Sequence, residues 1–327
     1  MKNKIELPFH TPMFSAYHWK AAACIVLQNN PTSDNWYFNN CIQLLCNDKF
    51  LTGKEESPGI IVENTHAWNI SVLQKSGIIN QFARYSVGEN IQAMLESGFY
   101  VNFMGVDDYY IQNKGDENNC HLSHDGILLG LNNKQKTYTI AAYKSDRHFG
   151  LLEIPQESFY KGFHSEYVNY QGELLGIKCI EEISIPLEID HIYFGIKKYL
   201  HSITPDCKDK QGLICGIITM IMLEKYVQMV LDGDLIVDQL DARTFLTVKE
   251  HKICMCKRLK RLAECKYIEP CIFSSYENDV VKASENLRLL SLKYNYTKQA
   301  ALLPQLIDVI RHLYKSEQMI LGQVVNK

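Results

Sequence analysis

The stretch TPMFSAYHWKAAACIVLQNN, residues 11–30, is patterned as a helix whose first turn could present a reactive group. Ser15 is a good N-cap, which would make Ala16 the first helical residue. The first turn of a helix offers unpaired N–H groups and a partial positive charge, so it lowers the pKa of a thiol and supplies donors for an oxyanion. A nucleophile therefore belongs at position 15 or 16, where the sequence has Ser and Ala.

A histidine that could act as the base lies at the start of a predicted strand. His124 begins the apolar run HDGILLGLNN, which together with KTYTIAAYKS predicts a hairpin around the turn NNKQ. If the loop of residues 109–122 joins antiparallel strands, Asp107 lies roughly opposite His124. Pairing across the NNKQ turn brings His124 near Tyr143, with Asp146 about one step beyond. A catalytic histidine needs an acceptor that orients its second ring nitrogen, and Asp107 or, alternatively, Asp146 could provide it.

A nucleophile on a helix followed by a histidine on a strand is the chain order of papain-like folds. The segments SAYHWKAAACIVLQNN, VNFMGVDDYYIQN and HLSHDGILLGLNNKQKTYTIAAYKSDRHFGLLEIPQESFYKGF resemble the N-terminal family of butirosin biosynthesis protein H. These are papain-like proteins of thiotemplated antibiotic pathways, and the resemblance spans roughly residues 8–200. It implies a cysteine acyltransferase. A thiolate takes an acyl group from the phosphopantetheine thioester of an acyl or peptidyl carrier protein, and a small amine or diamine then captures it as an amide.

The chain departs from this family at the position of the nucleophile. Family members open the helix with the catalytic cysteine followed by an aromatic residue, and that column falls here on Ala16, followed by Tyr17. Ala16 is then a Cys-to-Ala replacement that traps a substrate, or the mark of a natural pseudoenzyme, or a sign that the alignment is shifted and Cys24 is the nucleophile. Cys24 follows three alanines inside a helix, where a thiol is usually a small core hydrophobe. The resemblance also gives His10, six residues before Ala16, an oxyanion-stabilising role.

The apolar pattern changes near residue 189. Before it, helical patterns alternate with β-rich runs, and after it apolar residues recur at helical spacing. We therefore expect an α+β fold, with a papain-like catalytic domain over residues 1–188 and a helical region over 189–327. The expected strands are PGIIVENT at 58–65, 99–110, the two strands of the hairpin, and 174–183. The expected helices are 16–29, 35–46, 88–97, 189–202, 212–231, 241–265, 277–293 and 304–323.

The composition of the 327 residues is that of a globular protein, with 46% apolar and 22% charged residues. The net charge of −3, with both signs interspersed, disfavours nucleic acid and anionic membrane as partners. The most apolar segment is uncharged only from Gly212 to Leu223, too short to span a bilayer. The N-terminus has no apolar secretion signal, and the 11 scattered cysteines fit reduced thiols, so we expect a cytoplasmic protein.

We expect no metal and no cofactor, with phosphopantetheine entering only as part of the carrier-protein substrate. His251, Cys254 and Cys256 hint at a metal, but two thiols in Cys-x-Cys on a helix cannot share one face. Two rival functions stay open: a cysteine peptidase or amidase, which differs only in the acceptor, and a non-catalytic binding protein of the same fold. The oligomeric state, a homo-oligomer included, is also left open.

Overall fold

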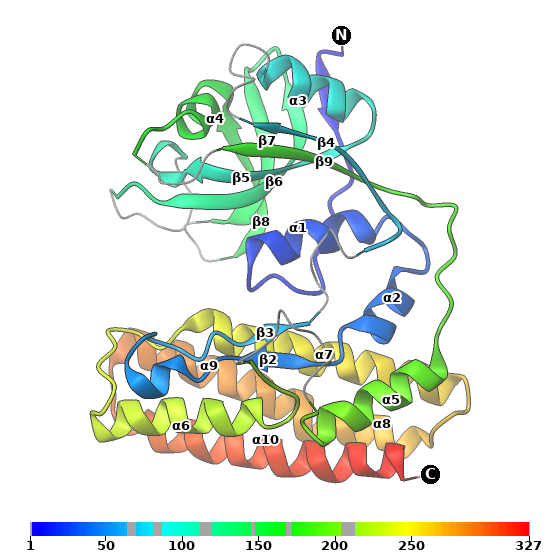
Figure 1. The fold of residues 1–327 in the computed structure, drawn as a ribbon, viewed down its shortest axis with the longest axis vertical. Helices are drawn as coiled ribbons and strands as arrows, with labels where there is room; N and C mark the ends of the chain where they lie inside the picture. The colour runs from blue at the N-terminus through cyan, green and yellow to red at the C-terminus, as the bar shows by residue number, and fades with distance from the viewer. Residues whose placement is uncertain are drawn as a thin grey trace. The chain divides into compact units, whose positions relative to one another are not determined.

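The computed structural model describes residues 2–63, 70–80, 87–111, 120–144, 148–167, 172–203 and 213–326. In these ranges the protein is mixed α/β, with an antiparallel sheet and C-terminal helices (Figure 1). It forms two compact units, one of residues 1–33 and 65–184 and the other of residues 34–64 and 185–327. The predicted domain of residues 1–188 is therefore wrong for residues 34–64, which belong with the C-terminal helices.

The first unit is built on a seven-stranded sheet, with the strand order β4-β9-β5-β6-β7-β8 and β1 paired to β6. Its strands are β1 (Lys4–Glu6), β4 (Leu73–Asn80), β5 (Tyr100–Asp107), β6 (Ser123–Asn132), β7 (Thr137–Tyr143), β8 (Phe149–Pro155) and β9 (Glu173–Cys179). Its helices are α1 (His18–Leu27), α3 (Val87–Glu96) and α4 (Gln156–Phe163), with the 3₁₀ turn η4 (Asp108–Tyr110) after β5. The predicted hairpin is confirmed as the antiparallel pair β6 and β7.

Helices cover both faces of this sheet (Figure 1). Helices α3 and α4 share one apolar core with β5, β6 and β7; the helical members of that core are Val87, Ile91, Leu95, Phe159 and Phe163. Helix α1 lies on the other face, and every residue from Lys20 to Leu27 is buried. Burial of one large apolar side chain contributes about 1.5–3 kcal/mol, so Ile25, Val26 and Leu27 contribute most to the burial energy of α1.

A β-bulge in β5 determines to which face of the sheet the last side chains of this strand point. The register shifts next to Gly105, whose φ of +71° lies in the left-handed region that favours glycine. Beyond the shift, Val106 pairs with His124 and Asp107 with Ser123. A shift of one residue turns a side chain to the opposite face of its strand. The bulge therefore places the side chain of Asp107 on the opposite face from that of His124.

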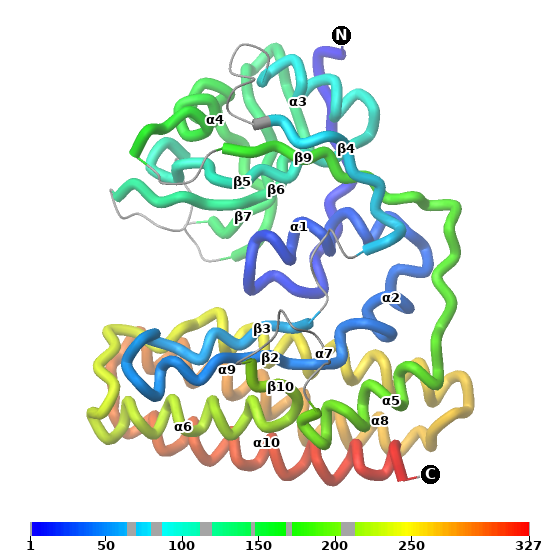
Figure 2. Tube along the Cα trace, viewed as in Figure 1, coloured from blue at the N-terminus to red at the C-terminus, as the bar shows by residue number. Residues whose placement is uncertain are grey.

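The second unit combines a helical bundle with a small sheet of order β10-β2-β3, and β10 runs beside β2 in the tube drawing (Figure 2). Its strands are β2 (Leu44–Cys46), β3 (Ile61–Val62) and β10 (Ile214–Cys215). Its helices are α2 (Ser33–Asn40), α5 (Ile189–Leu200), α6 (Thr219–Asp232), α7 (Ala242–Glu264), α8 (Pro270–Tyr276), α9 (Lys282–Thr297) and α10 (Leu302–Val325), with a 3₁₀ turn η1 (Lys49–Thr52) and a π-helical turn η6 (Glu277–Val281).

The five predicted C-terminal helices correspond to α5, α6, α7, α9 and α10, with shifted ends. Two predictions are wrong in part. The predicted helix 35–46 ends at Asn40, because Leu44–Cys46 pairs with β3 on one side and β10 on the other. For the same reason the predicted helix 212–231 begins only at Thr219, after β10.

A buried arginine attaches α2 to α7. The Arg258 guanidinium is fully buried, and its Nε donates to the carbonyl of Phe38 at 2.8 Å. Its Nη2 donates to the carbonyls of Tyr37 and Cys41 at 3.1 and 2.8 Å. The carbonyls at a helix C-terminus have no partners within the helix and carry a partial negative charge, so a cation there satisfies both needs.

A buried ion pair joins α7 to α10. Lys252 Nζ lies 2.6 Å from Glu317 Oε2, and both side chains are completely buried. The hydroxyls of Tyr199 and Tyr276 also donate to Glu317, at 2.9 and 2.5 Å. Burial, reinforced by the Glu317 charge, raises the pKa of both tyrosines well above its ordinary value. The carboxylate is thus satisfied by three donors from three helices, which is what a buried charge requires.

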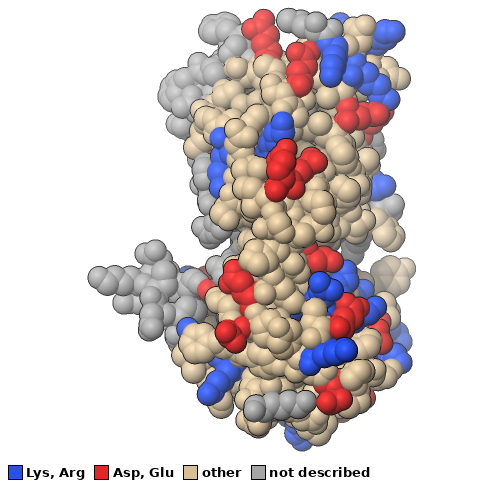
Figure 3. Space-filling model, turned by 90° about the vertical axis from the view of Figure 1, so that its right-hand side faces the viewer, with Lys and Arg blue, Asp and Glu red and all other residues tan. Residues whose placement is uncertain are grey.

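Charged side chains of both signs lie next to one another on the face drawn in Figure 3. Within the described ranges, no helix combines the length and the apolar character that crossing a membrane requires.

Candidate functional site

The segment before α1 is held by Tyr143 at the end of β7. Helix α1 begins at His18, with Tyr17 as an extended N-cap (φ −129°, ψ 131°) that makes no side-chain cap bond. The predicted N-cap, Ser15, is therefore wrong. Instead the Tyr143 hydroxyl donates to the Ser15 carbonyl at 3.1 Å, and the Ser15 hydroxyl lies 3.2 Å from the Tyr143 hydroxyl. Ala16 lies in the bend between Ser15 and the start of α1, and it is only 5% exposed.

The first turn of α1 contacts His124. The rings of His18 and His124 meet edge to face, with centroids 4.2 Å apart and an angle of 82° between the planes. The Tyr143 backbone N–H donates to His18 Nε2 at 3.4 Å, so α1, β6 and β7 meet at these three residues. The structure therefore brings the N-terminal end of α1, close to position 16, together with the predicted base.

The imidazole of His124 is oriented by a backbone carbonyl and by a carboxylate. Nδ1 lies 2.9 Å from the carbonyl oxygen of Asp125 and 3.8 Å from Asp108 Oδ2. A carbonyl can only accept, so the proton belongs on Nδ1, which makes Nε2 the basic nitrogen. The side chain of His124 is 22% exposed and that of Asp108 is 7% exposed, so this pair is only partly screened by water.

Asp107 orients a different histidine from the predicted one. Its Oδ2 accepts from His121 Nδ1 at 2.7 Å and from the Ser165 hydroxyl at 2.5 Å, and its Oδ1 accepts from the Tyr109 N–H at 3.1 Å. Burial alone would raise the pKa of this carboxyl, but the bonds from Ser165, His121 and Tyr109 outweigh it and hold the pKa below its ordinary value. The pairing of Asp107 with His124 is therefore wrong, and Asp108 is the carboxylate nearer to His124.

His121 is a residue that the sequence reasoning missed. Its ring is stacked between Tyr109 and Tyr167, with centroid distances of 4.3 and 4.2 Å. Together with Asp107 it forms a second histidine–carboxylate pair just before β6. Two signals could have found it: the first histidine in HLSHDG, and the glycine in MGVDD, which marks a bulge.

Cys24 lies in the interior of α1, away from this contact. It is 2% exposed, and its carbonyl accepts from the Gln28 N–H within the helix. It lies six positions after His18, which is roughly 9 Å along a helix axis. The alternative nucleophile is therefore placed among core residues rather than beside His124.

The two remaining predicted site residues do not join this group. His10 Nε2 lies 3.3 Å from the side-chain oxygen of Asn29, beyond the C-terminal end of α1. The oxyanion role of His10 is wrong on this geometry, because Ala16 precedes the opposite end of the helix. Asp146, the alternative carboxylate, lies outside the described residues.

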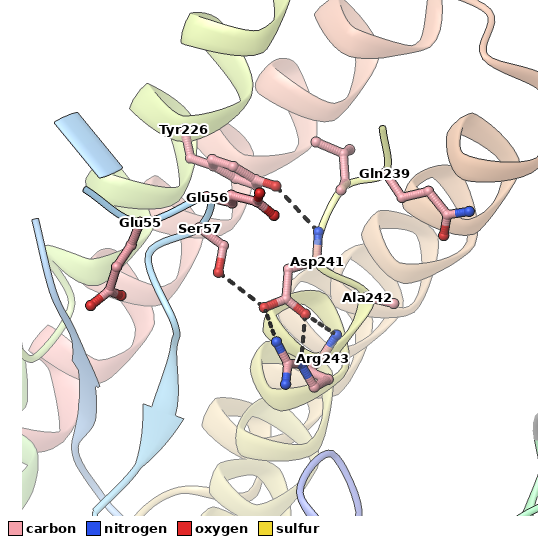
Figure 4. A pocket seen from close by; sticks show the side chains of 9 residues that line it. Glu55, Glu56, Ser57, Tyr226, Gln239, Asp241, Ala242 and Arg243 are labelled. Carbon is pink, nitrogen blue, oxygen red and sulfur yellow. Dashed lines mark hydrogen bonds and ion pairs between the residues drawn. The ribbon is translucent and has the colours of Figure 1, made fainter. Parts of the chain in front are cut away.

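A separate open cavity of about 540 Å³ lies in the second unit (Figure 4). Its polar centre is Asp241, the N-cap of α7, which is bound by the Arg243 guanidinium at 2.9 and 3.0 Å and by the Ser57 hydroxyl at 3.0 Å. Burial would raise the pKa of Asp241, but Arg243 and Ser57 hold it below its ordinary value. This carboxylate is already satisfied, and neither Cys nor His is among the described residues that line the cavity.

The residues that hinted at a metal are embedded in the helical unit. His251 Nε2 donates to the carbonyl of Ile42 at 2.8 Å, and burial lowers the pKa of this imidazole well below its ordinary value. Burial also raises the pKa of the Cys254 thiol. In the part of the chain that the structure describes, no three His, Cys, Asp or Glu side chains are grouped so that they could hold a metal ion.

The chain matches no protein-family model and no curated protein.

Proposed function

We propose that the protein has the papain-like arrangement of an amide-forming cysteine acyltransferase, with the nucleophile at position 16 and His124 as the base. In this chain Ala stands at that position, so the chain itself is inactive. The observation that supports the proposal is the contact of the first turn of α1 with His124, in which the ring centroids of His18 and His124 are 4.2 Å apart. A helix N-terminus and an imidazole near the same segment are the kind of environment that lowers the pKa of a thiol.

The reaction takes place in two transfers. A thiolate at position 16 attacks the carbonyl of a thioester, and the C–S bond to the carrier phosphopantetheine breaks as the leaving thiolate takes a proton from the His124 imidazolium. An amine then attacks the acyl-enzyme thioester, His124 Nε2 accepts a proton from that amine, and the thiolate at position 16 leaves. The substrates are therefore a carrier-protein thioester and a small amine or diamine, and the product is an amide.

Asp108 replaces Asp107 as the carboxylate of the proposed mechanism. It lies near Nδ1 of His124, so it stabilises the imidazolium that forms when Nε2 takes a proton. The burial of Ala16 favours an amine over water as the acceptor, because a thioester formed there is shielded from bulk solvent.

The test restores the thiol with the substitution Ala16→Cys. The variant is incubated with an S-acyl phosphopantetheine thioester, with and without a diamine, and followed by intact-protein and peptide mass spectrometry. We expect an acyl adduct on the peptide that contains position 16, and its conversion to free amide when the diamine is added. The same variant carrying His124→Ala is expected to lose amide formation.

The unaltered chain is the matched control, because it retains Cys24 and differs only at position 16. An adduct on the Cys24 peptide of the unaltered chain would show that the nucleophile has been misplaced. The absence of any adduct in Ala16→Cys, with carrier-bound as well as free thioesters, would refute the acyltransferase proposal. Hydrolysis with no preference for amines would favour the peptidase or amidase.

A second candidate, a non-catalytic binding protein, is favoured by one observation, namely that the residue in the first bend is Ala16 itself. It requires the chain as it stands to bind an acyl carrier or its acyl group. Calorimetric titration of the unaltered chain with an acylated carrier protein, and with the same carrier unacylated, tests it. Equal affinity for both, together with amide formation by Ala16→Cys, would exclude it.

A further inference from the structure

His18 and Tyr143 together connect the proposed base to both sides of position 16. Its ring packs edge to face on His124 and lies 5.4 Å from the ring of Tyr143. The same Tyr143 bonds to Ser15 through its hydroxyl and to His18 Nε2 through its backbone N–H. One residue of β7 therefore holds the chain immediately before and immediately after Ala16–Tyr17.

The contact with Tyr143 also determines the protonation state of His18. A backbone N–H can only donate, so Nε2 of His18 must be the unprotonated nitrogen of a neutral imidazole. A doubly protonated His18 would lose this bond and would carry a positive charge against the His124 imidazolium. A neutral ring, in contrast, offers an aromatic contact that tolerates the positive charge on His124.

We propose that His18 is a positioning residue for the base: a neutral imidazole, fixed through Nε2 by the Tyr143 N–H, that holds the His124 ring against the start of α1. The inference rests on the proposed function for its catalytic meaning, but its structural content does not depend on it. Among the described residues, the groups that face the histidine pair from neighbouring elements include Asp108 of η4, Tyr143 of β7 and Phe149 of β8.

The first measurement uses the chain as it exists. Long-range ¹H–¹⁵N spectra of the imidazoles report which ring nitrogen carries the proton. We expect His18 to show a single tautomer with Nδ1 protonated throughout the neutral pH range, and His124 to show the same tautomer. A protonated Nε2 on His18, or rapid exchange between its tautomers, would overturn the proposal without any substitution and without any assay of activity.

Two substitutions then separate the ring contact from the hydrogen bond. His18→Gln can keep the acceptor for Tyr143 but removes the ring, and His18→Phe keeps a ring but removes the acceptor. We expect the His124 ring signals to shift in His18→Gln and to stay close to their original positions in His18→Phe, because only the first removes the ring that packs on His124, while the Asp125 carbonyl keeps Nδ1 protonated in both. Unchanged His124 signals in a folded His18→Gln protein would contradict the positioning role.

The catalytic consequence is measured in the background of Ala16→Cys. Misplacement of a catalytic group costs up to about 10²-fold in rate, so His18→Gln is expected to lower kcat by roughly ten- to a hundredfold and to leave KM within about twofold. A rise in KM with unchanged kcat would assign His18 to substrate binding instead and overturn the proposal. If Ala16→Cys forms no acyl adduct at all, the proposed function fails, and the imidazole spectra still decide the role of His18.

Discussion

Asp107 provides a quantitative test of the first unit, because its buried carboxylate ties three segments together. It accepts from His121 before β6, from Ser165 after α4 and from Tyr109 in η4. The side chain of Asp107 is fully buried, whereas the ring of His121 is 29% exposed. The substitution Asp107→Ala therefore removes a paired buried charge and leaves a partner that can in part recover water.

The expected cost follows from these contacts. Hydrogen bonds to a charged group contribute about 1.5–3 kcal/mol each, but their sum overstates the loss because His121 can be hydrated. Breaking a buried pair by removal of one member costs about 3–5 kcal/mol, and we expect Asp107→Ala to fall in this range. Since 1.4 kcal/mol is a factor of ten, exchange through unfolding of the first unit should accelerate by roughly two to nearly four orders of magnitude.

The assay is hydrogen exchange followed by mass spectrometry, with the peptides of β5 and β6 compared with those of α10. The lowered pKa of Asp107 means that its contribution is present above the unfolded value of about 3.9 and is lost as the pH falls through the folded value. The difference between the unaltered chain and Asp107→Asn should therefore be constant near neutral pH and shrink below about pH 4. Asp308→Asn, an exposed change on α10, is the control. A loss below about 1 kcal/mol for Asp107→Ala, or one that is unaltered by acid, would refute this reasoning.

Three further predictions concern buried or site charges. Lys252→Met leaves the Glu317 carboxylate buried without its cation and should lower the free energy of unfolding by about 3–5 kcal/mol in urea denaturation. The exposed change Lys257→Met should lower it by about 0.5 kcal/mol or less, and equal losses would contradict the ion-pair account. Arg258→Lys loses the planar fork that bonds three carbonyls at the end of α2, so the α2 peptides should exchange about ten- to a hundredfold faster, and unchanged exchange would show that the fork is not needed. In the restored enzyme, Asp108→Asn should lower kcat by about tenfold or more, measured as amide formed per minute, and an undiminished rate would remove Asp108 from the mechanism.

The sequence predicts the approximate place of the site and mistakes the partner of its base. The hairpin of β6 and β7 and the helix over most of residues 18–27 follow from apolar periodicity, and the structure has both. The pairing of Asp107 with His124 assumed a symmetric loop over residues 109–122 and no bulge in the register of β5 against β6. The bulge at Gly105 shifts that register by one residue, which turns Asp107 toward His121 and leaves Asp108 near His124.

The sequence prediction placed residues 34–64 in the wrong unit for a different reason. Leu44–Cys46 is apolar enough to continue a helix, and no local pattern distinguishes it from one. What decides its structure is β10, far along the chain, together with Arg258, which bonds to Phe38 across 220 positions. Contacts of this kind carry no local signal, so sequence periodicity cannot anticipate them.

The prediction of where α1 begins was wrong for a third reason. Ser15 is a good N-cap by type, but its hydroxyl bonds to Tyr143 of β7, and the helix begins only at His18. A tertiary contact thus replaced a local preference, and it moved position 16 from the first helical turn to the bend before it.

The central claim is that position 16 and His124 share one electrostatic environment. The most direct measurement is the pH dependence of alkylation of Ala16→Cys by a small haloacetamide, followed at the peptide that contains position 16, with and without His124→Ala. The account predicts that the thiol reacts well below the ordinary pH range of cysteine when His124 is present and returns to that range when His124 is removed. Identical pH profiles in the two proteins would contradict it.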